Sequence, residues 1–231
     1  MQQTEDPSRL WAVLPVKNLG DAKHRLSGIL TASERRTLFA AMVEDVLSAL
    51  AVCDDLAGVV VVTQDPQAHE MAARYGAQTL VELENRGHTE ATTFGASALA
   101  DQGAAGMIQV PGDIPLVTAA DVSAVLRSHR QAPAVTIAPS RDELGSNAVA
   151  CSPPDVLPLR FGDDSFFPHL ERARSLGIEP TVVERPGIAL DVDTPADLAV
   201  FLASPSETRA YAYLQESGIA DRFTARNAAH P

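Results

Sequence analysis

Cysteine, aromatic residues and positive charge are all scarce in this sequence. Cys53 and Cys151 are the only cysteines among 231 residues, and they lack metal-ligand spacing, as expected for ordinary buried thiols of a reducing compartment. Lysine and arginine number 18 against 30 acidic residues, which gives a formal net charge of −12, and no basic stripe occurs. This charge balance argues against nucleic acid and against anionic membranes as partners.

Long apolar runs and the usual loop signatures are missing as well. No run reaches membrane-spanning length, and residues 1–9 lack the apolar core of a signal peptide. Gly20 and Gly28 have the wrong spacing for a dinucleotide fingerprint or a P-loop, and no Gly-x-Ser-x-Gly elbow occurs. We therefore expect a cytoplasmic protein without serine hydrolase chemistry.

Strand and helix patterns alternate through the first half of the chain. Residues 10–16 and 58–63 are apolar runs typical of buried strands, and the capping box at residues 31–34 begins an amphipathic helix. The alternation predicts an α/β fold with a mainly parallel central sheet and helices on both faces. In the second half, residues 181–184 and 187–190 are expected to form short strands.

The length of 231 residues suits one large α/β domain. We expect a flexible N-terminal tail at residues 1–9, a main domain at 10–203 and a peripheral C-terminal extension at 204–231, whose role stays open. Strands between residues 140 and 184 could pair within one chain or between two chains, so the sequence allows a homodimer.

Two acidic stretches, far apart in sequence, each follow an apolar run. Asp113 lies in the first, and Asp191 and Asp193 lie in the second. At the carboxyl edge of an α/β sheet the three would meet, and carboxylates that face one space repel unless a cation lies between them. Such oxygen ligands suit magnesium or manganese. The alternative is that Asp113 caps a turn and that Asp193 or Thr194 caps a helix.

A basic loop follows the first strand, where α/β proteins usually hold phosphates. Its cations are Lys17, Lys23 and Arg25. Because the glycine-rich signature is missing, these side chains would carry more of the phosphate binding than backbone amides. The alternative is a solvated loop. Together with a metal–carboxylate site, the loop indicates phosphoryl or nucleotidyl transfer.

Two small polar turns are candidate anion sites. Gly162 and Ser165 precede a helix whose first N–H groups would attract a carboxylate or phosphate, and Ser146 lies in a turn before a strand. A plain helix cap is the alternative for Ser165. His169 is expected to pack on its helix or face solvent, and His88 is a loop residue without an assigned partner.

In their order and spacing, these motifs resemble those of the guanylyltransferases of deazaflavin coenzyme F-420 biosynthesis. The resemblance covers Trp11 to about Ala203. It is carried by the following segments: Leu14-Pro15-Val16-Lys17, Ala22-Lys23-His24-Arg25-Leu26, Gly112-Asp113-Ile114-Pro115, Gly145-Ser146-Asn147-Ala148, Phe161-Gly162 with Ser165-Phe166 and His169, and Asp191-Val192-Asp193-Thr194-Pro195.

The resemblance implies a Rossmann-like nucleotidyltransferase fold and a defined reaction. GMP would move from GTP onto the phosphate of phosphoenolpyruvate, 2-phospho-L-lactate or 3-phosphoglycerate, and pyrophosphate would leave. The implied magnesium ligands are Asp113, Asp191 and Asp193. The implied acceptor-binding residues are Ser146, Gly162 and Ser165. The implied catalytic residues, which face the nucleotide phosphates, are Lys17, Lys23 and Arg25.

The nucleotide-binding loop at residues 86–90 departs from the family, which often carries Gly-Leu-Asn near this place. We expect Gly87 and Glu90 to contact the nucleotide, with Glu90 accepting hydrogen bonds from a guanine edge. Two other functions stay open: a molybdopterin-type nucleotidyltransferase, and a nucleotide-binding module that has lost catalysis. The sequence leaves the phospho-acid and the strictness of the GTP preference undetermined.

Overall fold

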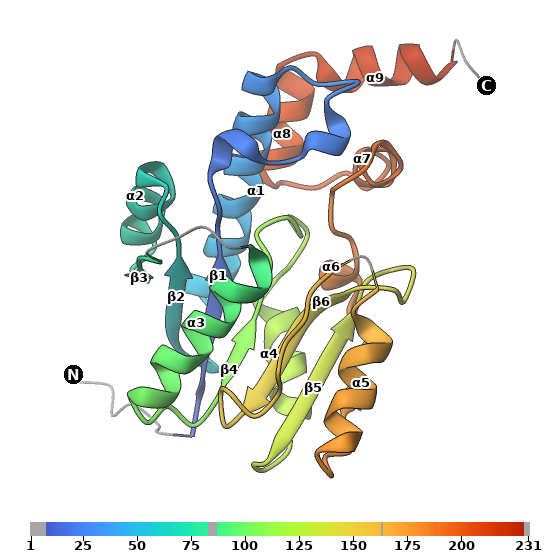
Figure 1. The fold of residues 1–231 in the computed structure, drawn as a ribbon. Coiled ribbons are helices and arrows are strands. Elements are labelled where there is room, and N and C mark those ends of the chain that lie inside the picture. The colour runs from blue at the N-terminus through green and yellow to red at the C-terminus, as the bar shows by residue number, and fades with distance from the viewer. Residues whose placement is uncertain (1–7, 83–86, 163, 229–231) are drawn as a thin grey trace.

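A seven-stranded sheet with the order β3-β2-β1-β4-β6-β5-β7 forms the centre of the protein in the computed structural model (Figure 1). The structure describes residues 8–82, 87–162 and 164–228. Most of the predicted N-terminal tail, residue 86 of the predicted nucleotide loop and the last three residues of the chain lie outside the described residues. The strands are β1 (Leu10–Pro15), β2 (Leu56–Val62), β3 (Gln78–Leu80), β4 (Met107–Gln109), β5 (Ala134–Pro139), β6 (Ser146–Ser152) and β7 (Thr181–Val182).

Helices connect these strands and extend beyond the last one. They are η1 (Leu19–Asp21), η2 (His24–Leu26), α1 (Ala32–Ala51), α2 (Pro66–Arg74), α3 (His88–Asp101), α4 (Ala119–Ser128), α5 (Phe166–Ser175), α6 (Pro186–Ala189), α7 (Pro195–Leu202), α8 (Arg209–Glu216) and α9 (Ile219–Ala228). The capping box predicted for α1 is present, because Thr31 and Glu34 bond each other's backbone N–H groups.

Most of the sheet is parallel. β1 pairs in parallel with β2 and β4, β2 with β3, and β5 with β7. Among the described strands, only β6 is reversed, and it runs antiparallel to β4 and to β5. The predicted mainly parallel sheet is therefore confirmed. The reversal of β6 has a consequence for the site, because it brings the first residue of β6 to the edge where β4 and β5 end.

Helices cover both faces of the sheet, as predicted. α3 and α5 pack on one face, where they bury Leu99 and Leu170 against Val13 and Ile137 (Figure 1). The other face carries the larger core, to which α1, α2, α4, α7 and α8 contribute. The central strands β1, β2 and β4 thus have apolar side chains on both faces, which suits β-branched runs.

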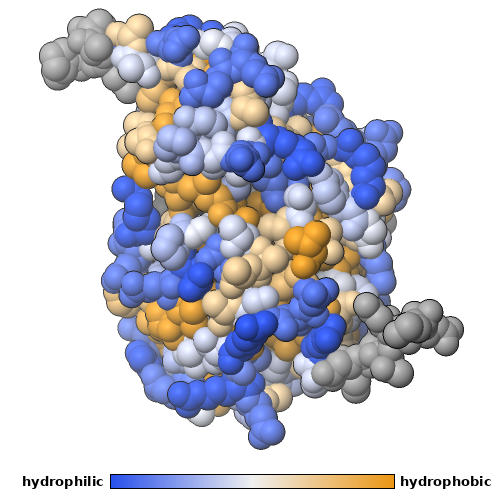
Figure 2. Space-filling model, turned by 180° about the vertical axis from the view of Figure 1, so that it is seen from behind, coloured by the Kyte–Doolittle hydropathy of each residue, from blue (hydrophilic) through white to orange (hydrophobic). Residues whose placement is uncertain are grey.

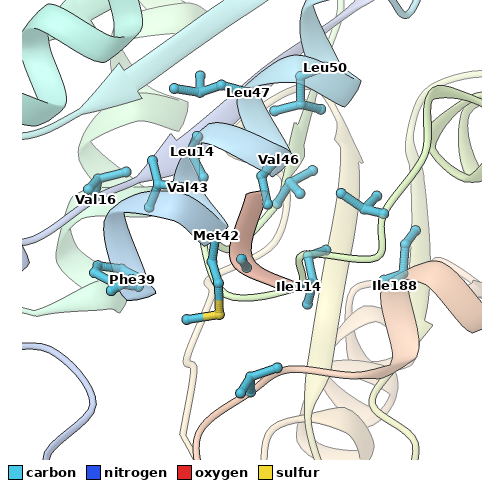
Figure 3. Close-up of a cluster of buried hydrophobic side chains, with 14 of the residues drawn as sticks. Leu14, Val16, Phe39, Met42, Val43, Val46, Leu47, Leu50, Ile114 and Ile188 are labelled. Carbon is cyan, nitrogen blue, oxygen red and sulfur yellow. The ribbon is translucent and has the colours of Figure 1, made fainter. Parts of the chain in front are cut away.

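The larger core also anchors the acidic stretches. Met42 and Val46 of α1 lie near Ile114 and Ile188 in the cluster of Figure 3. Ile114 directly follows Asp113, and it is fully buried. Burial of a leucine- or isoleucine-sized side chain contributes about 1.5–3 kcal/mol, so this packing holds the backbone that carries Asp113 firmly in place.

The C-terminal helices pack against α1 and the loop before it. Asp45 of α1 accepts hydrogen bonds from the backbone N–H groups of Arg209 (2.8 Å) and Ala210 (2.9 Å), which caps the start of α8. In α9, the guanidinium of Arg226 donates to the carbonyl of Gly28. This pair of helices therefore lies against the segment that carries the basic loop (Figure 1).

One predicted strand is wrong. Residues 187–190 were expected to be extended, but α6 occupies Pro186–Ala189. Pro186 takes the first helical position, where its missing N–H costs nothing. A β-carbon on Gly187 would lie 2.7 Å from the carbonyl oxygen of Leu116, so the helix packs too closely for a side chain there. A tertiary contact thus overrides the weak local strand signal.

The described surface mixes polar and apolar residues. Figure 2 shows hydrophilic residues over much of the side opposite to that of Figure 1, with hydrophobic residues between them. Within the described residues, no helix is both long enough and apolar enough to cross a membrane.

Candidate active site

A cleft of about 1000 Å³ opens at the edge of the sheet where β1 and β4 end. Lys17 follows β1, Asp113 follows β4, and Ser146 begins the reversed β6. The cleft brings together all the predicted site residues except Lys23, which contacts two of its lining carboxylates. The predicted residues in its lining are Lys17, Arg25, Gly87, Glu90, Asp113, Ser146, Gly162, Ser165, Asp191 and Asp193.

The two acidic stretches meet directly. The backbone N–H of Val192 donates to the carbonyl oxygen of Asp113 over 2.9 Å, which ties the segment after α6 to the segment after β4. Asp191 and Asp193 flank Val192 and both line the cleft. The predicted meeting of three aspartates at one sheet edge is therefore what the structure shows.

Lys23 joins two of these aspartates. Its Nζ lies 2.6 Å from Asp113 Oδ2 and 3.4 Å from Asp193 Oδ1. The Lys23 side chain is nearly inaccessible, and its backbone adopts the left-handed conformation with φ 59°. Burial lowers the pKa of Lys23, but the two carboxylates outweigh this effect and hold the pKa above its usual value. Lys23 is therefore a buried, charged counterion of the acidic cluster.

The carboxyl groups respond differently to this environment. Burial raises the pKa of Asp113, but the Lys23 ammonium outweighs burial and holds that pKa below its usual range. Burial and the nearby Asp113 carboxylate raise the pKa of Asp191. Asn147 donates to Asp191 Oδ1 over 3.1 Å and to the Ile188 carbonyl over 2.9 Å, which fixes the direction of the Asp191 side chain.

One carboxylate oxygen is left without a partner. Asp113 Oδ1 is buried and accepts no hydrogen bond within the described part of the chain. A buried, unsatisfied carboxylate oxygen costs about 1–3 kcal/mol or more, so its position calls for a further ligand. Within the same residues, no three histidine, cysteine, aspartate or glutamate side chains form a group that could hold a metal ion. The cation that contacts Asp113 and Asp193 in this structure is the Lys23 ammonium.

The donor chemistry nevertheless suits a hard cation. Asp113, Asp191 and Asp193 offer only carboxylate oxygens, which are the ligands that magnesium and manganese prefer. Asp113 Oδ1 is the oxygen of this set that has no hydrogen-bond partner within the described residues. Arg25 Nη1 lies 3.2 Å from Asp193 Oδ2 and adds positive charge at the outer side of the cluster.

A neutral network forms another wall of the cleft. The backbone N–H of Ser146 donates to Ser165 Oγ over 3.0 Å, and His169 Nδ1 lies 2.9 Å from Ser146 Oγ. The backbone N–H groups of Ser165 and Phe166 both donate to the Leu144 carbonyl over 2.9 Å. These bonds join the turn before β6 to the start of α5 and place both serine hydroxyls beside the cleft.

The start of α3 forms a third side of the cleft. Gly87 caps this helix with φ 121° and ψ 176°, a conformation open only to glycine. A β-carbon on Gly87 would lie 3.2 Å from Glu90 Oε2 and 3.7 Å from Lys17 Nζ. The free N–H groups of the first helical turn, together with Lys17, would attract an anion here, whereas Glu90 opposes it.

His88, at the start of α3, has partners that the sequence did not reveal. Gln109 Nε2 lies 3.1 Å from His88 Nε2, and because an amide nitrogen only donates, the histidine accepts. The rings of His88 and Phe161 meet edge to face with centroids 4.8 Å apart. Burial lowers the pKa of His88 to about 4, so His88 is neutral at physiological pH.

Arg141 and Asn147 also line the cleft and were not predicted as site residues. Asn147 belongs to the same predicted polar turn as Ser146, but no ligand-binding role was predicted for its side chain. Arg141 reaches the cleft because its backbone N–H bonds the Ala189 carbonyl over 2.8 Å, a long-range contact without a sequence signal.

A smaller hollow of about 310 Å³ adjoins this region. It lies beyond the ends of β1 and β2, and Lys17 lines it as well as the main cleft. Its other lining residues are Val16, Asn18, Val62, Thr63, Gln64, Asp65, Pro66, Glu82 and Ala91. The two spaces therefore share one cationic side chain.

The mixed α/β sheet with a cleft at its carboxyl edge is consistent with the Rossmann-like nucleotidyltransferase fold class. A solved structure from Desulfovibrio desulfuricans G20, described as a nucleotide-diphospho-sugar transferase, has a similar fold. The TM-score is 0.75 at 20% sequence identity, and the match covers 94% of this chain and 98% of that one. The predicted fold class is therefore confirmed.

Sequence comparison identifies the family within this class. The family model described as "Guanylyl transferase CofC like" matches residues 10–230, and the chain belongs to this family. A phosphoenolpyruvate guanylyltransferase of Sphaerobacter thermophilus is 37% identical over 187 residues, which are 81% of this chain and 89% of the relative. A 2-phospho-L-lactate guanylyltransferase of Methanothermobacter thermautotrophicus is 36% identical over 215 residues, which are 93% and 92% of the two chains.

Proposed function

We propose that this protein transfers GMP from GTP to the phosphate of a small phospho-acid, with release of pyrophosphate, in coenzyme F-420 biosynthesis. The acceptor would be phosphoenolpyruvate, 2-phospho-L-lactate or 3-phosphoglycerate. The observation that carries this proposal is the cleft itself: three aspartates, two of them paired with the buried Lys23, and two serines line one space. Membership of the guanylyltransferase family supports the same reaction.

The reaction needs little covalent chemistry from the protein. A phosphate oxygen of the acceptor forms a bond to the α-phosphorus of GTP, and the bond from that phosphorus to the bridging oxygen breaks. Because the acceptor phosphate is already ionised near neutral pH, no general base is needed. The barrier lies in bringing two anions together and in stabilising charge on the leaving pyrophosphate.

The acidic cluster would hold Mg²⁺, with Mn²⁺ as a substitute. Asp113, Asp191 and Asp193 are the proposed ligands, and the unsatisfied Asp113 Oδ1 supports this assignment. When bound, the ion would neutralise phosphate charge and align the reacting groups. Because Asp113 Oδ1 has no other partner in the described residues, Asp113 is the central ligand of the proposed metal site.

The cations of the basic loop would act on the nucleotide phosphates. Lys17 lies at the cleft beside Gly87, and Lys23 and Arg25 both form ion pairs with Asp193. Their charges counter the negative field of a protein with a net charge of −12. Lys23 is held by burial and two carboxylates, so its ammonium is already oriented before a substrate arrives.

The acceptor would bind at the neutral wall. Ser146 and Ser165 present hydroxyls there, and Gly162 has open space in place of a side chain. The phosphates would then lie between this wall and the acidic cluster. If the nucleotide phosphates bind near Lys17 and Gly87, the base would lie in the smaller hollow, which Lys17 also lines. Glu90, in the lining of the main cleft, is a candidate hydrogen-bond acceptor for guanine.

A pyrophosphate-release screen of four nucleoside triphosphates against three phospho-acids tests this proposal. We expect release with GTP, with at least one acceptor, and only in the presence of a divalent cation. Release that depends on molybdopterin instead would favour the second enzyme class. Tight GTP binding by calorimetry with no release under any acceptor would favour a silent nucleotide-binding module.

A homodimer stays a prediction from the sequence. Size-exclusion chromatography with light scattering checks it, and a molar mass near 24.5 kDa at micromolar concentration would contradict it.

A further inference from the structure

His169 is almost completely buried, at 1% exposure, although histidine is a polar residue. It lies on α5 one turn after Ser165, and its backbone N–H donates to the Ser165 carbonyl over 3.1 Å. Its ring reaches from α5 to the turn before β6. A buried imidazole needs partners for both ring nitrogens, so its hydrogen bonds define its protonation.

The two partners of His169 fix one tautomer. The backbone N–H of Arg160 donates to His169 Nε2 over 3.0 Å, so Nε2 carries a lone pair and no proton. Burial lowers the pKa of His169 to about 4, which leaves the ring neutral at pH 7. The single ring proton therefore lies on Nδ1, 2.9 Å from Ser146 Oγ, and the histidine donates to the serine.

This donation determines what the Ser146 hydroxyl can do. Because Ser146 Oγ accepts from His169, its own proton points elsewhere, and no acceptor for that proton occurs in the part of the chain that the structure describes. Ser146 lines the cleft, so the proton is available to a bound ligand. Ser165 Oγ likewise accepts, from the Ser146 N–H, and keeps its own proton for a ligand.

We propose that His169 is a positioning residue that holds the Ser146 hydroxyl as a hydrogen-bond donor to the phospho-acid. The inference rests on the proposed function, because it takes Ser146 as part of the acceptor site. Two serine donors side by side match a carboxylate or phosphate oxygen of the acceptor. A ligand group that is itself only a donor would be rejected there, because no acceptor would face it.

His169 also has a packing role that the test must separate from positioning. Its ring meets Phe161 edge to face with centroids 5.2 Å apart. Substitution of His169 by asparagine or by glutamine separates positioning of Ser146 from packing. The amide nitrogen of asparagine lies near the place of Nδ1 and can donate to Ser146, whereas the glutamine oxygen lies near Nε2 and can only replace the bond to Arg160.

The kinetic test compares His169→Gln, His169→Asn, Ser146→Ala and the double variant His169→Gln/Ser146→Ala. We expect His169→Gln to raise the KM for the phospho-acid about tenfold while the KM for GTP stays unchanged. In His169→Asn, the KM for the phospho-acid should stay close to that of the wild type. The KM of the double variant for the phospho-acid should be no higher than that of Ser146→Ala alone, because both substitutions remove the same hydrogen-bond donor, the Ser146 hydroxyl. His129→Gln is the matched control, since His129 bonds Thr136 and Ser152 outside the cleft lining.

Equal effects on both KM values, or effects that add in the double variant, would overturn the proposal. A second measurement does not depend on turnover: ¹⁵N NMR of the imidazole nitrogens at pH 7. It should show the neutral ring with the proton on Nδ1, and a proton on Nε2 or a charged ring would overturn the proposal even if GMP transfer is confirmed. If the wild type releases no pyrophosphate, the proposed function fails, and the NMR result still decides the tautomer on which the proposal depends.

Discussion

The acidic wall and the neutral wall of the cleft are built in opposite ways. At the neutral wall, hydrogen bonds join Ser146, Ser165 and His169, and both serine hydroxyl protons lack an acceptor within the described residues. At the acidic wall, a buried lysine balances carboxylates incompletely, and Asp113 Oδ1 has no partner in the described structure. The side chains of the neutral wall are thus fixed by hydrogen bonds before binding, whereas the acidic wall has a buried carboxylate oxygen without a partner in the described residues.

The contrast assigns different tasks to the two walls. Fixed, neutral donors can select a ligand by shape and by the position of its oxygens. A charged cluster with an unsatisfied oxygen can bind a cation and, through it, phosphates of many molecules. Substrate choice should therefore depend on the neutral wall and reaction rate on the acidic wall.

Asp113→Asn removes the charge of the central carboxylate. We expect pyrophosphate release to fall by about a thousandfold, equivalent to roughly 4 kcal/mol of transition-state stabilisation, with little change in the KM for the phospho-acid. Steady-state kinetics at saturating Mg²⁺ measure this loss. Asp55→Asn, which changes a carboxylate paired with Arg127 on the surface, is the control and should retain full turnover. Undiminished turnover in Asp113→Asn would contradict the metal assignment.

Lys23→Met leaves the acidic cluster without its buried counterion. We expect a loss of about 3 kcal/mol in unfolding free energy without divalent cations, which lowers Tm by about 6–12 °C for a chain of this size. Added Mg²⁺ should restore part of that loss, because the carboxylates are then free to bind it.

Thermal unfolding is measured once with about 10 mM Mg²⁺ and once with a chelator, because this concentration is about tenfold above the roughly 10⁻³ M dissociation constants of weak divalent-cation sites. Lys23→Arg keeps the charge and serves as the control, with a smaller response to Mg²⁺. A Lys23→Met variant that is as stable as the wild type in chelator would refute the role of Lys23 as a counterion.

The buried His169 should make stability depend on pH. Its pKa of about 4 in the folded state lies below the usual value of 6.5. The unfolded chain therefore binds more protons between these pH values, and stability falls as pH drops from about 6.5 to 4. At pH 5 this residue alone should cost about 2 kcal/mol relative to pH 7.

Urea unfolding at pH 7 and pH 5 measures this difference. His169→Gln should lose that part of the pH dependence, whereas His69→Gln, at an exposed position on α2, should keep it. The same pH dependence in wild type and His169→Gln would show that His169 is not a buried neutral base.

Gly87→Ala should have the smallest effect and should act on the nucleotide side. The conformation at Gly87 is strained for any other residue, at a cost of about 1–3 kcal/mol, and the new methyl group would approach Glu90 Oε2. We expect a several-fold weaker binding of GTP by calorimetry. Gly76→Ala, at φ 70° with open space around it, should lose stability without changing GTP binding. Equal GTP affinity in Gly87→Ala and Gly76→Ala would show that Gly87 does not contribute to GTP binding.

Local signals in the sequence predicted most of the fold and of the acidic wall. The apolar runs before Asp113 and the capping patterns at Thr31 and Thr194 locate strand and helix ends, because they act within a few residues. The parallel sheet then brings the carboxyl ends together without further information. This logic is sufficient to place Asp113 at the edge. Asp191 follows the helix α6 and not the strand expected there, and its segment is held at the same edge by the hydrogen bond from the Val192 N–H to the Asp113 carbonyl.

The neutral wall could be predicted only in part, because it depends on contacts between distant segments. Ser146 and Ser165 were visible as polar turns, but the reversal of β6 and the packing of α5 bring His169 to Ser146. His169 was expected to pack on its helix or face solvent, and its bond across the cleft wall has no local signal. Likewise, the helix at residues 186–189 depends on close packing of Gly187 against Leu116, which a four-residue apolar run does not reveal.

The most direct test of the proposed reaction is ³¹P NMR of the protein with GTP, Mg²⁺ and phosphoenolpyruvate. GMP transfer predicts that the GTP signals are replaced by free pyrophosphate and by two mutually coupled phosphorus signals of a new phosphoanhydride that joins GMP to the acceptor. Unchanged GTP, or its conversion to GDP and inorganic phosphate, with each of the three phospho-acids would contradict it.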